Sequence, residues 1–336
     1  MKPGERPLRR LLEVCGFAAP LADPLTTEVV ANRSGEIGVE RDGAWSWHAA
    51  PEATFERLET IAVYAAHAAG AEFDEKHALA RGTLPGGERL QACRPKATRQ
   101  GVIALTVRKP AIVARRVDDP DFEAMFSRVG APRSKAQDLA LIELKRRGQW
   151  REFWKLAVRS RRTIGACGAT GSGKTDFIKR LLQEIPEGER IVTAEDADEF
   201  GALRQRNHVA LFFAEPGQPG VSAEDCVRAA RRMRPDRIML QECRGPEAFA
   251  FVQALAAGHP GGMTSWHAEE GEAFDALELM LKQHGGAATL PDAKARSLLR
   301  RYLDIVVWLA RGDDGFSAPQ VWVKAEEDLA PCADEA

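Results

Sequence analysis

The sequence lacks any pair of closely spaced cysteines. Six cysteines are scattered along the 336 residues, and none belongs to a C-x-x-C motif. Disulfide frameworks and structural zinc sites need cysteines at defined spacings, whereas isolated cysteines are typical of a reducing compartment. We therefore expect neither a structural disulfide nor a zinc site. The cysteines are Cys15, Cys93, Cys167, Cys226, Cys243 and Cys332.

The sequence also lacks a long apolar run. No stretch of about 18 or more apolar residues is present, so no transmembrane helix is expected. The first residues, MKPGERPLRRLLEV, contain too short an apolar stretch for a secretory signal. The sequence therefore predicts a cytoplasmic protein whose association with a membrane is peripheral and made through partners.

A third absence is an excess of positive charge. The formal net charge is −2, whereas a protein that holds bulk nucleic acid normally carries a strongly basic face. We therefore expect no direct, specific nucleic-acid binding. With 44% hydrophobic and 29% charged residues the composition is that of a globular protein, and the length suggests about two domains.

The clearest motif present is a phosphate-binding loop. Residues 168–175 read GATGSGKT and match G-x-x-x-x-G-K-[ST] at every fixed position, between a strand-like run (163–167) and a helix-like run (176–184). Glycines let backbone N–H groups turn toward phosphate, and the helix adds the positive end of its dipole. The pattern predicts that Lys174 reaches the β and γ phosphates and that the Thr175 hydroxyl holds Mg²⁺. The predicted nucleotide-binding residues of this segment are Gly168, Ala169, Thr170, Gly171, Ser172, Gly173, Lys174, Thr175 and Asp176.

Residues 1–110 are expected to form a smaller α+β domain. Two strands hinged near Asn32 to Gly35 precede a long helix in residues 51–70, which Pro51 is expected to start and Gly70 to end. Two further strands are predicted at 89–93 and 102–107. Residues 111–135 lose this alternation and gain prolines, so they are interpreted as a linker.

Residues 136–325 are expected to form an α/β domain. Strands and helices alternate there, which indicates a mostly parallel sheet covered on both faces. Ligands of such sheets bind beyond the carboxyl ends of the strands. The acidic tail, 326–336, is expected to be solvated and disordered. The predicted strands span 163–167, 190–194, 208–213, 237–240, 263–266, 305–310 and 320–323.

Several of these strands end in ionisable residues. Glu195 and Asp196 close one strand, and Glu242 closes the apolar strand RIMLQ, as a Walker B segment requires. A carboxylate opposite a phosphate loop can orient Mg²⁺ or the attacking water. The segment GHPGGMTSWHA holds His259 and His267, whose spacing suits a phosphate sensor or an interface better than a metal site.

Four segments in order resemble the boxes of the secretion-superfamily traffic ATPases. They are GATGSGKT, TAEDADEF, RMRPDRIMLQECRG and AGHPGGMTSWHA, which are similar to Walker A, the Asp box, Walker B and the His box. The first domain resembles the N-terminal domain of VirB-type ATPases of type IV secretion and conjugation, through TEVVANRSGEIGVERDGAW, LPGGERLQACRP and GVIALTVRKP. The resemblance covers about residues 8–311 and implies a RecA-like P-loop ATPase domain preceded by a smaller α+β N-terminal domain.

The resemblance also implies roles for individual residues. Glu195 corresponds to the Asp-box carboxylate, Glu242 to the Walker B glutamate and second metal ligand, and Arg108 to an N-domain arginine that meets the nucleotide. The cofactors implied are ATP and Mg²⁺. The remaining implied residues are the His-box pair His259 and His267, with His267 catalytic, and the arginines flanking Walker B, Arg234 and Arg244.

At the level of the whole protein, the resemblance implies a homohexameric ring at the cytoplasmic face of the inner membrane. Such a ring works with the inner-membrane and other ATPase components of a type IV secretion machine. Hydrolysis would drive domain motion for substrate export, conjugal transfer or pilus assembly. The sequence departs from the family pattern at Asp176, Cys243 and Trp266, none of which removes a catalytic group.

Other classes of P-loop protein fit the sequence less well. A P-loop phosphotransferase leaves the His box and the first domain unexplained, and an ABC-type ATPase would carry an LSGGQ-like signature. A nucleic-acid-dependent RecA-like motor needs a basic stripe. The arginines between residues 228 and 237 offer one, but Glu224, Asp225 and Asp236 lie among them.

Overall fold

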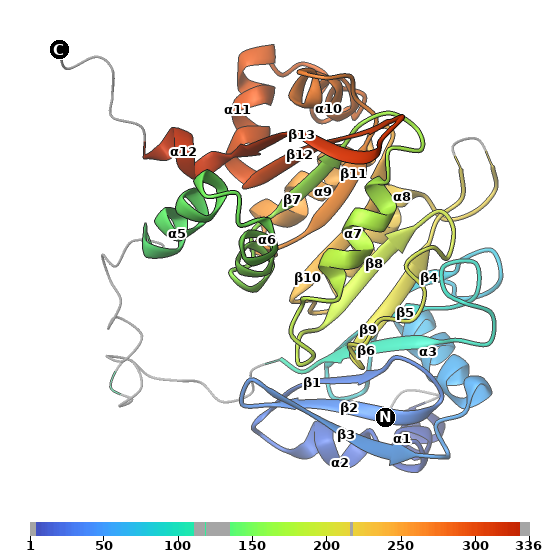
Figure 1. Cartoon of the computed structure of the whole chain (residues 1–336). Coiled ribbons are helices and arrows are strands. Elements are labelled where there is room, and N and C mark those ends of the chain that lie inside the picture. Colours follow the sequence, from blue (N-terminus) through green and yellow to red (C-terminus); the bar gives the residue numbers. More distant parts are fainter. Residues whose placement is uncertain (1–4, 111–117, 119–134, 216–217, 330–336) are drawn as a thin grey trace.

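The computed structural model describes residues 5–110, 118, 135–215 and 218–329. Within these ranges the chain forms one sheet of six strands and one of seven. The strands of the first sheet lie between Thr26 and Arg108, and those of the second lie between Ile164 and Val323. Figure 1 shows the second sheet above the first, with its edge strand β9 facing the first domain. Most of the predicted linker lies outside the described residues, and the domain boundaries remain predictions.

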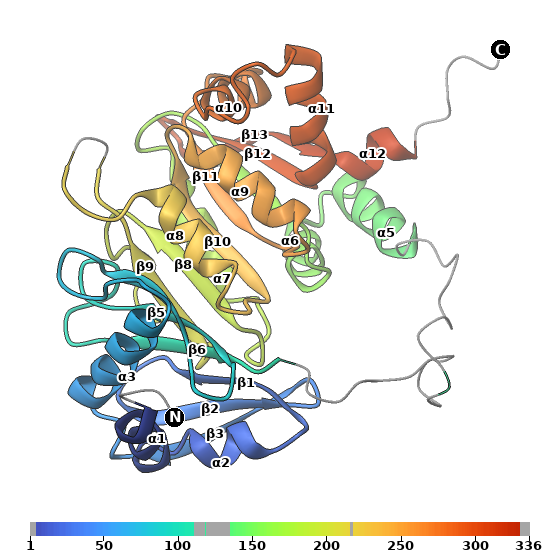
Figure 2. The same ribbon diagram turned by 180° about the vertical axis from the view of Figure 1, so that it is seen from behind.

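The first domain is an antiparallel sheet with helices on one side. The strand order is β3-β2-β1-β6-β5-β4, and Figure 2 shows α1, α2 and α3 beside this sheet. Gly82 of β4 lets α3 approach closely, because a Cβ at Gly82 would lie 2.6 Å from the backbone of Ala65. The strands are β1 (Thr26–Ala31), β2 (Gly35–Arg41), β3 (Ala44–Ala50), β4 (Leu79–Thr83), β5 (Arg89–Cys93) and β6 (Ala104–Arg108), and the helices are α1 (Glu5–Val14), α2 (Ala18–Ala22) and α3 (Phe55–Ala68).

The second domain is built on a mostly parallel sheet. Its order is β13-β12-β7-β11-β10-β8-β9, and only the β12–β13 pair is antiparallel. The central strands are buried almost throughout, because helices cover both of their faces. The strands are β7 (Ile164–Cys167), β8 (Ile191–Glu195), β9 (His208–Phe212), β10 (Arg237–Cys243), β11 (Met263–Trp266), β12 (Ile305–Gly312) and β13 (Gly315–Val323).

Two apolar clusters lie on opposite faces of this sheet. One joins the strands to α5 (Lys135–Arg146), α6 (Trp150–Arg159) and α7 (Lys174–Leu182). The other joins them to α8 (Ala223–Ala230), α9 (Glu247–Ala256), α10 (Ala273–Lys282) and α11 (Asp292–Tyr302). Figures 1 and 2 show these two groups of helices on the two sides of the sheet. The sheet is therefore covered on both faces, as the alternation of strands and helices predicts.

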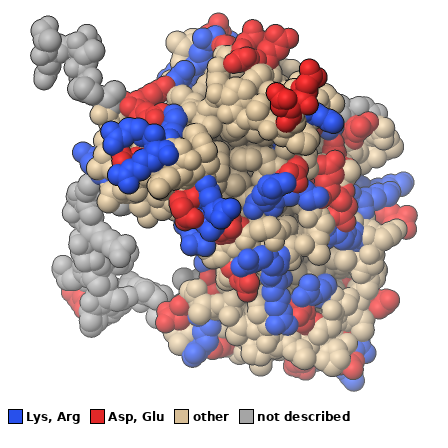
Figure 3. Space-filling view, in the orientation of Figure 1, with Lys and Arg blue, Asp and Glu red and all other residues tan. Residues whose placement is uncertain are grey.

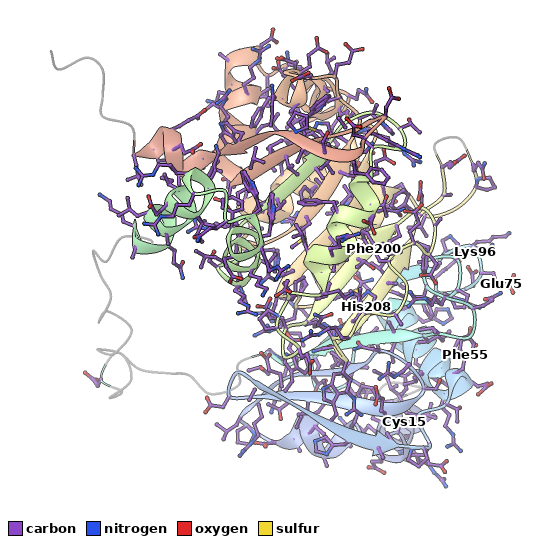
Figure 4. The ribbon with its side chains drawn as sticks, viewed as in Figure 1. Cys15, Phe55, Glu75, Lys96, Phe200 and His208 are labelled. Carbon is purple, nitrogen blue, oxygen red and sulfur yellow. The ribbon has the colours of Figure 1, made fainter. Side chains whose placement is uncertain are left out.

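The first domain packs along β9. The Phe212 amide donates to the carbonyl of Ala97 at 3.0 Å, and the Arg99 guanidinium donates to Asp198 through Nε and Nη2 at 2.6 and 2.7 Å. His208 of β9 lies on this side of the second sheet (Figure 4). The N-terminal domain thus covers the edge of its own chain's second sheet.

The opposite edge strand, β13, is irregular. Trp308 pairs with Gln320 and Ala310 with Ser317, so two residues of β13 oppose one residue of β12. This is a β-bulge, and Pro319 lies within it. Most of β13 is exposed.

Several details differ from the sequence predictions. The helix expected from Pro51 begins at Phe55, because Thr54 caps it by accepting from the Arg57 amide. Strands β3 and β4 and helix α6 were not predicted. The expectation of a disordered tail does not hold for 326–328, which lie in α12 (Lys324–Asp328), where Glu326 pairs with Lys145 at 2.6 Å. Residues 330–336 lie outside the described residues.

Candidate active site

The phosphate loop lies where the carboxyl end of β7 meets the start of α7. Gly168 and Gly173 have backbone φ angles of +145° and +87°, which residues with a Cβ rarely adopt. A Cβ at Gly168 would also collide with the carbonyl of Leu309 on β12. Ala169, Thr170 and Gly171 form the exposed rim of the loop. The backbone therefore takes the cradle shape that the motif predicts, at the amino end of a helix.

Lys174 is folded back onto the loop. Its buried side chain donates from Nζ to the carbonyls of Gly168 at 2.9 Å and Ala169 at 2.8 Å. Burial lowers the pKa of Lys174, and the nearby Glu242 carboxylate opposes that shift. The Ser172 hydroxyl is buried and has no hydrogen-bond partner among the described residues. An ammonium and a hydroxyl are thus available for an anion held in the loop.

A chain of polar contacts links the phosphate loop to the Walker B strand. Lys174 Nζ lies 3.3 Å from His267 Nδ1, and His267 Nε2 lies 2.8 Å from Glu242 Oε1. Because an ammonium can only donate, His267 Nδ1 accepts from Lys174. The pair of His267 Nε2 and Glu242 Oε1 is a close contact without hydrogen-bond geometry. Arg244 binds the other Glu242 oxygen through Nη2 at 2.7 Å and reaches Asp196 through Nη1 at 2.6 Å.

These contacts come from adjacent strand ends. Glu242 closes β10, His267 follows β11, and β11 lies between β10 and the phosphate-loop strand β7. Adjacent parallel strands have their carboxyl ends on the same side of the sheet. Residues nearly 100 positions apart in sequence therefore come together there. The structure thereby brings together four of the predicted site residues, namely Lys174, Glu242, Arg244 and His267.

Glu195 does not join this network. Its side chain is fully buried and accepts from the Thr193 hydroxyl at 2.6 Å and the Phe200 amide at 3.0 Å. Burial raises the pKa of Glu195, and these two hydrogen bonds only partly offset the rise. The next residue, Asp196, instead turns toward Arg244. The catalytic role of Glu195 therefore stays a prediction.

Three other predicted residues lie near the amino ends of the strands, away from the phosphate loop. Arg234 precedes β10 and His259 precedes β11, so both lie beside the amino ends of strands whose carboxyl ends face the phosphate loop. Together with Arg108 they line a cavity of about 910 Å³. Arg108 is 73% exposed and lies 3.7 Å from Glu28. Burial lowers the pKa of His259, whose Nδ1 lies 3.3 Å from the Pro235 carbonyl oxygen.

The last two predicted residues lie on α7. Thr175 is half-buried in its first turn. Asp176 is exposed and pairs along the helix with Arg180 at 2.8 Å, which leaves it on the outer surface of α7.

The sequence analysis did not assign three residues that contribute to the site. Asp196 was noted at a strand end but not assigned to the site, and the Leu309 carbonyl and the Phe316 ring approach the loop from the β12–β13 hairpin. The hairpin is about 140 residues from the loop, so no local pattern links them. The available signal was Phe316 itself, an aromatic residue in the polar turn GDDGFS.

The arrangement defines a class of protein. RecA-like ATPases combine a phosphate loop on a parallel sheet, a carboxylate at the end of the second strand away, and a polar residue just after the strand between them; here that residue is His267. Among the described residues, no helix is both long and apolar enough to cross a membrane.

Comparisons with known proteins specify the family. The model of the family described as "Type II/IV secretion system protein" matches residues 18–299. "Type IV secretion system protein VirB11" of Brucella suis is 36% identical over 335 residues, which cover 95% of this chain and 92% of that protein. "Type IV secretion system protein PtlH" of Bordetella pertussis is 38% identical over 292 residues, which cover 84% and 85%.

A solved structure agrees with these relatives. The VirB11 ATPase of the Brucella suis type IV secretion system, in complex with sulphate, is 35% identical and has a TM-score of 0.90 over 96% of each chain. The chain belongs to the type II/IV secretion system protein family and is a type IV secretion ATPase. The predicted RecA-like ATPase domain with a smaller α+β domain before it is confirmed.

Proposed function

We propose that the protein binds Mg-ATP at the phosphate loop and hydrolyses it within a hexameric ring that drives type IV secretion. The observation that carries the chemistry is the chain of contacts from Lys174 through His267 to Glu242. A γ-phosphate in the loop would compete with the loop carbonyls for Lys174, and so loosen the contact between Lys174 and His267. His267 thereby connects the presence of a γ-phosphate to the catalytic carboxylate.

Mg²⁺ fits the donors at this edge. The Thr175 hydroxyl and the Glu242 carboxylate are oxygen donors of the kind that Mg²⁺ prefers, alongside nucleotide phosphates. When bound, the ion would neutralise charge on the transferred phosphoryl group. Glu242, whose side chain is only 14% exposed, would orient the attacking water.

The first prediction separates binding from hydrolysis. Lys174→Ala should lose most nucleotide binding and all hydrolysis, because it removes the cation that holds the phosphates. Glu242→Gln should keep nucleotide affinity within about threefold and lose turnover by about 100-fold or more, because it leaves the cradle intact. Phosphate release and binding of a fluorescent ATP analogue measure the two quantities.

The control for this experiment is Glu270→Gln, which neutralises an exposed carboxylate in the segment after β11. It should behave as wild type. Near wild-type hydrolysis by Glu242→Gln would show that Glu242 is not the catalytic carboxylate.

The position of Arg108 supports a ring. Arg108 lies by the amino ends of the strands, whereas the phosphate loop lies at their carboxyl ends, so Arg108 does not serve the loop of its own chain. Its exposure leaves the guanidinium open to a neighbouring copy. In a head-to-tail ring, each subunit would present Arg108 to the nucleotide of the next, where a bidentate guanidinium stabilises transferred charge.

The second prediction tests this arrangement by mixing subunits. Arg108→Ala should reduce turnover by about 100-fold with a smaller change in nucleotide binding, and Arg108→Lys should restore it only in part. Arg108→Ala mixed with Lys174→Ala should recover up to about one quarter of wild-type turnover, because random neighbours then form some complete sites.

Light scattering with a non-hydrolysable ATP analogue should first show that both variants form the wild-type oligomer. Recovery on mixing would be absent if Arg108 acted within its own chain. A strictly monomeric wild-type protein under these conditions would contradict the ring itself.

The partners and location follow from the family. We infer that the ring works with inner-membrane and other ATPase components of a type IV secretion machine, at the cytoplasmic face of the membrane. What supports this is the similarity to VirB11 and PtlH over most of their lengths. On the face seen in Figure 3, basic and acidic side chains are interspersed. Turnover that rises on adding DNA would instead favour a nucleic-acid-dependent motor.

A further inference from the structure

The β12–β13 hairpin lies directly against the phosphate loop. The Leu309 carbonyl of β12 occupies the space that a Cβ at Gly168 would need. At the other end of the loop, Phe316 Cδ1 lies 3.1 Å from the Cβ position of Gly173. The hairpin therefore contacts the loop at its first glycine and at the glycine before Lys174.

The direction of a bound nucleotide can be inferred from the strand order. Glu242 lies in β10 and His267 directly follows β11, on one side of the phosphate-loop strand β7, whereas β12 lies on its other side. The terminal phosphate must face the catalytic carboxylate. The ribose and base then extend away from it, toward the β12–β13 side.

Phe316 is a large apolar residue on the β12–β13 side, and its side chain is unusually exposed for such a residue. Its residue is 68% exposed, and it is the second residue of the edge strand β13. The Arg311 guanidinium carbon lies 5.4 Å from the centre of the Phe316 ring. The guanidinium lies over one face of the ring, which leaves the other face for a flat π-system such as a nucleobase.

We propose that Phe316, supported by Arg311, stacks on the base of the nucleotide whose phosphates the loop holds. Phe316 is then a binding residue for the nucleobase. The hairpin thereby supplies a base contact that none of the four sequence boxes was assigned. This inference rests on the proposed nucleotide site and adds the half of the ligand that Lys174 and Glu242 do not touch.

The test compares ADP with inorganic pyrophosphate, which carries the same phosphates without a base. In calorimetric titrations with Mg²⁺, Phe316→Ala should weaken ADP binding about tenfold, a change of about 1.4 kcal/mol. This lies within the range for base–aromatic stacking. Pyrophosphate binding should stay unchanged, and Phe316→Tyr should bind ADP as wild type does.

Two further variants keep the test decisive. Phe316→Leu preserves apolar contact with the loop but has no ring face, so it should also lose ADP affinity selectively. Leu279→Ala is the matched control, since Leu279 is also 68% exposed but lies on α10.

The outcomes separate this inference from the proposed function. Equal losses for ADP and pyrophosphate would show that the ring only supports the loop, and no loss for ADP would show that it does not touch the base. Either result would overturn the inference and leave the phosphate site intact. A wild-type protein that binds neither ligand would overturn the phosphate site and this inference together.

Discussion

Glu28 is a carboxyl group buried at the junction of the two domains. Glu28 is only 2% exposed, and its Oε2 has no hydrogen-bond partner among the described residues. Burial raises the pKa of Glu28 to about 8, although Arg108 lowers it in part, and Glu40 adds to the rise. At neutral pH the folded protein therefore favours the protonated form, which the unfolded chain does not.

The pH dependence of stability tests this raised pKa of Glu28. A raised pKa in the folded state contributes stability that is fully present below about pH 4.5 and is lost as the pH rises through about 8. Glu28→Gln cannot ionise, so its Tm relative to wild type should rise between pH 5 and pH 8.5, by at least about 2–4 °C, the shift that each kcal/mol gives in a large domain. Thermal unfolding followed by circular dichroism measures both values. An equal difference at the two pH values would contradict the assignment.

Adjacent carboxylates show what a sequence leaves open at this scale. Glu195 ends β8 and Asp196 follows it, and the sequence resemblance assigns the Asp-box role to Glu195. Successive residues of a strand point to opposite faces, so one of the pair must enter the core and the other the open edge. The structure sends Glu195 to Thr193 and Asp196 to Arg244. Only the register of the folded strand decides between them.

Elements with a strong local signal were predictable. Strands β5 and β11 match their predicted bounds, and α8 begins after Ser222, whose hydroxyl accepts from the Asp225 amide as its capping-box spacing indicates. These elements carry buried apolar residues or a cap within a few positions. The phosphate loop and the acid of β10 belong to the same group.

Elements without such a signal were not predictable. Strand β3 is exposed along most of its length, so its sequence AWSWHAA shows no apolar face. The approach of Phe316 to Gly173 depends on the pairing of β12 with β7, which brings together distant segments. The position of Arg108 by the amino ends of the strands, away from the phosphate loop, likewise depends on how the first domain packs on β9. Chain topology, and not local pattern, decides these features.

At the scale of the whole molecule, Arg190 joins the two domains. It is fully buried and donates through Nη1 to Asn32 at 2.9 Å and through Nη2 to Thr106 at 3.0 Å, both in the first domain. Its Nε donates to the Met233 carbonyl of the second domain at 2.7 Å. Burial lowers the pKa of Arg190 to about 10, so the side chain remains charged at neutral pH. A buried cation bonded to both domains holds them as one body.

Removing this side chain should therefore uncouple the domains. Arg190→Ala leaves several buried polar groups unpaired, each at about 1–3 kcal/mol, and calorimetry should then show two unfolding transitions where the wild type shows one. Arg206→Ala is the control, because its ion pair with Glu36 at 2.5 Å also joins the domains but Arg206 is half exposed. A single transition in Arg190→Ala would show that other contacts suffice to couple the domains.

The two edges of the ATPase sheet also limit how copies of this chain can associate. Free strand edges recruit further strands and lead to aggregation. Here the first domain covers β9, and the bulge with Pro319 interrupts the hydrogen-bonding edge of β13. Neither edge offers a regular template for another strand. Copies that associate through this domain would therefore meet through side-chain surfaces, which can slide and separate, and not through a continuous seven-stranded sheet that would lock them together.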